Sequence, residues 1–164
     1  MAAAGVQLMN WFGVACELVV SSAHRAPEAT ARWAREARKR GLRVLVAGAG
    51  GAAHLAGALA ANSRLPVLGV PLASSPLGGF DALLSTVQMP PGVPVGTLGV
   101  GAWGAKNAAH LALRILALED AGLARRLEEG AEAVEMILDG RIDRAMTRFN
   151  HRRPEKPGEG EFGT

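Results

Sequence analysis

Cysteine and aromatic residues are scarce in this chain. Its 164 residues include one cysteine, Cys16, together with four phenylalanines, three tryptophans and no tyrosine. A single cysteine excludes an internal disulfide framework and a cysteine-rich zinc site, and it suits a reducing compartment such as the cytoplasm. Alanine, valine, leucine and glycine must therefore build the interior, which favours close packing of helices through small residues.

Formal charge is also missing from the middle of the sequence. Residues 44–105 contain only two charged side chains, Arg64 and Asp81. So long an uncharged stretch indicates a central parallel sheet covered on both faces, or surface buried between subunits, and we expect both. We interpret the basic segments 32–43 and 141–156 as a solvated helix face and a loose tail. Neither carries a groove-fitting or stacking element, so no nucleic-acid partner is expected.

No hydrophobic run is long enough to indicate a membrane span. Residues 44–63 lack formal charge but contain four glycines, His54 and Asn62, which fit a strand, a loop and a helix better. Residues 1–23 faintly resemble a secretory signal, yet they have no basic beginning, and Glu17 interrupts the apolar stretch. We therefore expect neither secretion nor a membrane partner.

The order of apolar runs, glycines and prolines predicts alternating strands and helices. Strands are expected at 15–20, 42–47, 66–70 and 95–98, and helices at 1–12, 27–40, 52–61, 80–87, 103–119 and 121–149, with a break near Gly140. Repeated strand–helix units imply one parallel sheet with right-handed crossovers and helices on both faces. We predict one domain over residues 1–150 and a disordered tail over 151–164, where prolines and glycines accumulate.

Two turns that follow predicted strands carry the reactive side chains. Ser22, His24 and Arg25 follow the first strand, and His54 opens the helix after the second. The carboxyl ends of parallel strands lie at one edge of a sheet, where ligands bind, so we predict a single active site. His24 can give and take a proton near neutral pH, while Ser22 and Arg25 can bind a phosphate or a carboxylate. His54 is expected to face the same crevice.

The glycine segment from Gly48 to Ala53 matches the dinucleotide-binding pattern G-x-G-x-x-A. Such a site also needs an acidic residue about 20 positions further on, whereas the next acid is Asp81. A nicotinamide or flavin site is therefore disfavoured, but glycine amides at a helix N-terminus can still bind an anion. The alternative is that the glycines only permit close packing. Two histidines without further ligands do not predict a metal site.

Several stretches occur in a characteristic order along the chain. They are Ser-Ala-His-Arg-Ala-Pro at 22–27, the glycine segment at 47–55, and the stretches 66–71, 81–90, 92–98 and 107–109. Together they closely resemble the purine-biosynthetic 5-(carboxyamino)imidazole ribonucleotide mutases, over residues 13–127 with hardly a gap. The glycine segment with His54 is similar to the mutase branch rather than to the branch that fixes free carbon dioxide.

This resemblance implies a fold and a reaction. The fold is a three-layer α/β/α domain with a central parallel sheet, flavodoxin-like or Rossmann-like, which assembles into a homo-octamer without a metal or organic cofactor. The reaction interconverts 5-(carboxyamino)imidazole ribonucleotide and 4-carboxy-5-aminoimidazole ribonucleotide in de novo purine (IMP) biosynthesis. The carboxylate moves from the exocyclic nitrogen to the ring carbon C4 through bound carbon dioxide, so the ribonucleotide and carbon dioxide are the expected partners.

The resemblance also implies a role for each site residue. His24 is the acid/base that protonates the nitrogen and later takes the C4 proton, which suits one imidazole in a closed pocket. The residues implied to border the carboxylate are Gly50, Gly51, Ala52, His54 and Leu55. The residues implied to contact the ribonucleotide are Ser22, Ala23 and Arg25.

The sequence departs from the family pattern in three places. Ala56 follows His-Leu where the family has proline, and residues 73–77 read Ala-Ser-Ser-Pro-Leu in place of Gln-Ser-x-x-Leu. The family opens with a strand and a Gly-Ser-x-Ser-Asp loop that holds phosphate and ribose, so we expect the first strand to be missing here. One reading is a shortened or wrongly started reading frame of an enzyme, nearly inactive as written. The others are a degenerate subunit with a structural or regulatory role, and a related nucleotide carboxylase or decarboxylase.

Overall fold

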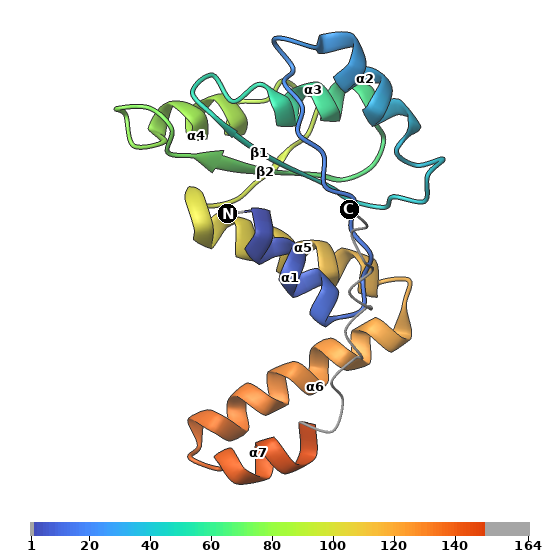
Figure 1. The fold of residues 1–164 in the computed structure, drawn as a ribbon, viewed down its shortest axis with the longest axis vertical. Coiled ribbons are helices and arrows are strands. Elements are labelled where there is room, and N and C mark those ends of the chain that lie inside the picture. The colour runs from blue at the N-terminus through green and yellow to red at the C-terminus, as the bar shows by residue number, and fades with distance from the viewer. Residues whose placement is uncertain (1, 150–164) are drawn as a thin grey trace, which may run out of the picture.

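The computed structural model describes residues 2–149, with side chains from residue 5 onward. Helices and strands alternate along the central part of the chain (Figure 1). The strands are β1 (Leu45–Gly50), β2 (Val67–Leu72) and β3 (Gly96–Thr97). The helices are α1 (Ala2–Trp11), α2 (Pro27–Glu36), α3 (Leu55–Asn62), α4 (Phe80–Val87), α5 (Gly101–Ala117), α6 (Ala121–Leu138) and α7 (Ile142–Phe149).

The three strands form one parallel sheet in the order β1-β2-β3. β1 and β2 pair along their whole length, from Leu45 opposite Val67 to Gly50 opposite Leu72. The first five residues of β2 are buried, as expected for a central strand covered on both faces. The predicted parallel sheet is confirmed, and both long strands end at the same edge.

Helices cover both faces of this sheet (Figure 1). On one face, Ala34 of α2 and Leu59 of α3 pack with Val67 in a buried cluster. On the other face, Leu68 packs with Ala108 of α5, and α1 lies against α5. Successive residues of β2 thus point to opposite layers, as the pleat of a strand requires. The predicted three-layer α/β/α fold is confirmed.

The C-terminal helices project from this body as an arm (Figure 1). The carboxylate of Asp120 accepts a hydrogen bond from the Leu123 backbone N–H at 2.9 Å and caps the start of α6. Gly140 adopts a φ of 73° between α6 and α7. The predicted break near this glycine is confirmed, since a left-handed residue ends a helix readily.

The predicted strand over residues 15–20 is wrong. Within the described part of the chain its backbone makes no ladder hydrogen bond with β1, and Val20 is fully exposed. Apolar β-branched residues favour a strand, but a strand exists only when a neighbouring edge pairs with its backbone. Side chains hold this segment instead.

Glu17 ties the segment to the helix that follows it. Trp33 donates its indole N–H to Glu17 at 2.9 Å, and Arg40 donates to the other carboxylate oxygen at 3.3 Å. The Arg40 guanidinium also lies 5.1 Å from the centre of the Trp33 ring. The hydrogen bond from Trp33, with further help from Arg40, lowers the pKa of Glu17 against a smaller opposing effect of desolvation.

Element boundaries differ from expectation at the end of α2, which ends four residues earlier than predicted, and at the glycine segment. β1 begins three residues later than predicted and runs to Gly50, so part of the expected loop belongs to the strand. The helix over 80–87 agrees with its prediction. No helix among residues 2–149 is long and apolar enough to span a membrane. The tail predicted for 151–164 lies outside the described residues, and the single domain over 1–150 stays a prediction.

Acidification is expected to loosen residues 15–21 from α2. Because folding lowers the pKa of Glu17, its contribution to stability is present above its ordinary pKa of 4.5 and is lost as the pH falls through the lower folded value. Trp33 fluorescence should therefore change below that pH in a Trp11→Phe/Trp103→Phe background, since both replaced side chains are exposed. The Glu17→Gln variant should lack this change in fluorescence. If the change persists in Glu17→Gln, another group causes it.

Candidate active site at the carboxyl end of the sheet

Two predicted site histidines meet at the carboxyl end of β1. Nδ1 of His54 lies 3.1 Å from Nε2 of His24, within hydrogen-bond distance. The ring centroids are 5.0 Å apart and the ring planes are inclined by 47°. Both side chains are exposed, so a ligand can reach the pair. His54 therefore lies next to His24, which agrees with the expectation that the two side chains are neighbours.

Hydrogen bonds fix the loop that carries His24. The backbone N–H of Arg25 donates to the Ser22 hydroxyl at 3.3 Å, and that of Ala26 donates to the Ser22 carbonyl at 2.9 Å. The buried Thr30 hydroxyl donates to the Ala26 carbonyl at 2.9 Å. Its single hydrogen is then used, so the Ser21 hydroxyl must donate to Thr30 across their 2.7 Å contact. The loop is held against α2 on both sides.

His54 is held by a tight turn. The backbone N–H of Ala53 donates to the Gly50 carbonyl at 3.1 Å, which closes the turn after β1. Gly51 has a φ of 61° and Ala53 a φ of 43°. Ala53 is the only non-glycine residue of the described chain with a positive φ, a conformation that costs about 1–3 kcal/mol. Its burial holds it there, and His54 follows directly as the N-cap of α3.

Ser74 lies against this turn, and the sequence interpretation did not include it. A Cβ placed on Gly50 would lie 1.8 Å from the Ser74 hydroxyl oxygen and 3.0 Å from the Leu72 carbonyl oxygen. Gly50 is therefore required for close approach, independently of any anion. The signal that could have found Ser74 is its position, since it follows the end of β2 as the glycine turn follows β1.

Asp81 follows the loop that contains Ser74 and lies in the first turn of α4. A hydrogen bond from the Ser75 side chain lowers the pKa of Asp81, and the backbone N–H of Ala82 acts in the same direction. This carboxylate therefore stabilises the start of α4, where negative charge is favourable.

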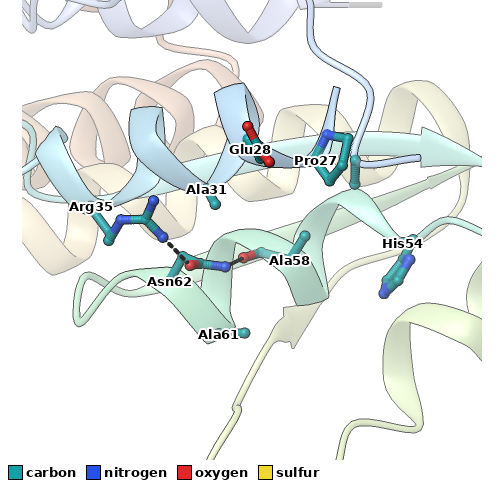
Figure 2. Close-up of a pocket in the computed structure, with 9 residues that line it drawn as sticks. Pro27, Glu28, Ala31, Arg35, His54, Ala58, Ala61 and Asn62 are labelled. Atoms are coloured by element: carbon teal, nitrogen blue, oxygen red, sulfur yellow. Dashed lines mark hydrogen bonds between the residues drawn. The ribbon is translucent and has the colours of Figure 1, made fainter. Parts of the chain in front are cut away.

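A pocket of 480 Å³ opens between α2 and α3, with His54 at one end (Figure 2). Ala23 and His54 line it at the site, and alanines and a proline form much of its wall. Arg35 donates to the Asn62 side chain at 2.7 Å, and Asn62 donates to the Ala58 carbonyl at 2.9 Å, at the far side (Figure 2). The residues that line the pocket are Ala23, Pro27, Glu28, Ala31, Arg35, His54, Ala58, Ala61 and Asn62.

The remaining predicted residues are close to His24 or His54 in the sequence and do not line this pocket. Arg25 is exposed, and its guanidinium has no acidic partner among the described residues. The backbone N–H groups of Gly51 and Ala52 form no hydrogen bond with other described residues. Leu55 is half-buried at the start of α3. An exposed cation therefore follows His24 directly in the chain, and two unpaired amide groups precede His54 in the turn after β1.

The described part of the chain offers no metal site. No three histidine, cysteine, aspartate or glutamate side chains within residues 5–149 come together in a way that could hold a metal ion. The chemistry that this arrangement of described residues can perform is proton transfer by an imidazole beside bound negative charge.

Comparison with known proteins identifies similar chains. The family model described as AIR carboxylase matches residues 1–136. A Saccharolobus solfataricus protein named N5-carboxyaminoimidazole ribonucleotide mutase is 52% identical over 139 residues, or 84% of this chain and 87% of that protein. A Pyrococcus abyssi protein of the same name is 53% identical over 126 residues, or 77% and 71% of the two chains. A Bacillus subtilis protein, also of that name, is 51% identical over 131 residues, or 80% and 81%.

Gly50→Ala is expected to destabilise the protein by about 1–3 kcal/mol, the usual cost of overpacking. The added methyl group would collide with Ser74, whereas Gly48→Ala meets only Leu72 carbon atoms at an ordinary 3.7 Å. Denaturant unfolding of the two variants measures the difference. Ser74→Gly should recover part of the loss in the Gly50→Ala background. Equal stability of the Gly50→Ala and Gly48→Ala variants would contradict the close approach.

Proposed function

Because the chain belongs to the AIR carboxylase family, we propose that it interconverts 5-(carboxyamino)imidazole ribonucleotide and 4-carboxy-5-aminoimidazole ribonucleotide in purine biosynthesis. The observation that carries this proposal is the contact between His24 and His54, in a chain about half identical to curated mutases of that substrate. The enzyme is an isomerase that moves one carboxylate within its substrate.

The first half of the reaction requires an acid. His24, as imidazolium, donates its proton to the exocyclic nitrogen while the bond from that nitrogen to the carboxylate carbon breaks. Carbon dioxide and 5-aminoimidazole ribonucleotide result, and His24 is left neutral. The exposure of His24 at the end of the sheet supports this role, because the substrate must reach the imidazole directly.

The second half requires a base at the same place. Ring carbon C4 attacks the bound carbon dioxide, and a carbon–carbon bond forms while C4 still carries its hydrogen. Neutral His24 then takes this proton, which restores the aromatic ring and the imidazolium. One imidazole therefore completes the cycle without a net proton change, and carbon dioxide serves as a bound intermediate rather than a free substrate.

The loops around the two histidines bind the carboxylate and the phosphate of the substrate. The unpaired amides of Gly51 and Ala52 support a carboxylate position beside His54, with Gly50 and Leu55 at its border. The unpaired guanidinium of Arg25 supports contact with the phosphate of the ribonucleotide, next to Ser22 and Ala23.

His24→Asn is expected to lower kcat for interconversion by at least about 100-fold in both directions, since general acid–base catalysis contributes that much or more. Asparagine keeps polarity and similar size but cannot exchange a proton near neutral pH. Spectrophotometric assay of both directions measures the loss. His110→Asn is the matched control, because His110 is an exposed histidine on α5.

The outcome separates the enzyme from a degenerate family member. The acid/base role is supported if the unsubstituted (parent) chain and His110→Asn turn over the substrate and His24→Asn does not. Turnover retained within about tenfold, or roughly 1.4 kcal/mol in the barrier, removes His24 from that role. A folded parent chain without turnover contradicts the proposed activity itself.

We also propose that the chain works as a homo-oligomer, most simply an octamer, in the cytoplasm. Large apolar side chains are exposed on several helices, which is unusual for an isolated chain. Leu118 is 85% exposed, Trp103 83%, and Leu138 of the arm 80%. Their positions on α5, at its end and on the arm support contacts between copies. The single Cys16 suits a reducing compartment.

Size-exclusion chromatography with light scattering is expected to give a mass near eight times the 17.0 kDa of one chain. Burial of the exposed apolar side chains between copies is the physical reason for assembly. A smaller closed oligomer would correct the number of subunits. A clean monomer at micromolar concentration would contradict association.

A further inference from the structure

The contact between His24 and His54 involves defined nitrogen atoms. Nε2 of His24 and Nδ1 of His54 are 3.1 Å apart, and a hydrogen bond between them requires one hydrogen and one lone pair. Either His54 donates from Nδ1, or His24 donates from Nε2. The two arrangements differ in which nitrogen of His24 remains available to a ligand.

Only one arrangement survives a change in the protonation of His24. If His54 donated, the imidazolium form of His24 would place a second hydrogen on Nε2, and two N–H groups would face each other. If His24 donates from Nε2, this hydrogen is present in both its neutral and its cationic form. The hydrogen bond then persists whenever His24 gains or loses a proton at Nδ1.

We propose that His54 is a positioning residue whose Nδ1 lone pair accepts a hydrogen bond from Nε2–H of His24 throughout the reaction. This inference rests on the proposed function and adds to it the nitrogen that reacts. Nδ1 of His24 gives its proton to the exocyclic nitrogen of the substrate, and the same atom later receives the proton from C4. His54 stays neutral, with its own hydrogen on Nε2.

The surroundings of His54 suit this task. The turn at Gly50–Ala53 fixes the backbone before it, and the positive φ of Ala53 directs the chain into α3. His54 is the N-cap residue of α3, but its side chain makes no capping hydrogen bond. Its ring is therefore free to serve His24, and its replacement removes no helix cap.

The bond to His54 has one physical effect on His24. It fixes the direction in which Nδ1 points, much as the carboxylate of a catalytic triad orients its histidine. This effect acts on the rate of proton transfer rather than on substrate affinity.

Nitrogen-15 NMR of the histidine rings tests the arrangement without any substrate. The full parent chain should show neutral His24 with hydrogen on Nε2, and a coupling between Nε2 of His24 and Nδ1 of His54 through the hydrogen bond. His54→Leu should abolish this coupling, while the control His110→Leu should leave it unchanged. A hydrogen on Nδ1 of His54 would overturn the proposal. So would a His24 spectrum in His54→Leu that is identical to the one in the parent chain.

Kinetics of two substitutions test the consequence. His54→Leu removes the acceptor and should lower kcat by about 10- to 100-fold, as loss of an orienting partner commonly does. His54→Asn offers an amide oxygen near the position of Nδ1 and should restore most of kcat. KM should change little in both variants. An unchanged kcat in His54→Leu, equal losses in both variants, or an effect on KM alone would overturn the positioning role.

The two tests separate this inference from the proposed function. If the folded parent chain has no mutase activity, the proposed function fails, while the NMR coupling still decides whether His24 donates to His54. If the parent chain is active and the coupling is absent, the proposed function stands and the positioning role of His54 is refuted.

Discussion

The parallel pairing of β1 with β2 determines where the loops that carry Gly50, His54 and Ser74 lie. Their register ends both strands together, with Gly50 opposite Leu72. The loops that follow are therefore forced into contact, and Gly50 fits against Ser74 only because it has no side chain. His54 comes four residues after Gly50, so its place next to His24 depends on this register as well. Small residues at the sheet edge are thus a condition for assembling the site.

Each histidine is held by a different kind of constraint. The loop with His24 depends on hydroxyl groups, since Ser21 and Thr30 link it to α2. The turn before His54 depends on strained backbone at Ala53, whose burial keeps it in place. Rigid loops that carry exposed imidazoles suit a reaction in which one proton moves between two atoms of the same substrate. The fold supplies position, and the imidazole supplies the chemistry.

Most of the fold and part of the site could be predicted from the sequence. The helix at 80–87 and the break at Gly140 follow from local patterns. His24 and His54 meet as expected, although the segment before His24 is not the strand on which that expectation rested. The strand predicted at 15–20 failed because its β-branched residues do not provide a partner edge. Ser74 was not predicted to belong to the site, because its importance comes from contact with Gly50, a neighbour in space rather than in sequence.

The central claim is that a carboxylate moves within one bound substrate while His24 handles the proton. The most direct test supplies 5-(carboxyamino)imidazole ribonucleotide labelled with carbon-13 in its carboxylate, in buffer that contains unlabelled bicarbonate. The account predicts that 4-carboxy-5-aminoimidazole ribonucleotide forms and keeps the label, because carbon dioxide stays in the site between the two steps. Product with unlabelled carboxylate, or no product from the folded chain, would contradict it.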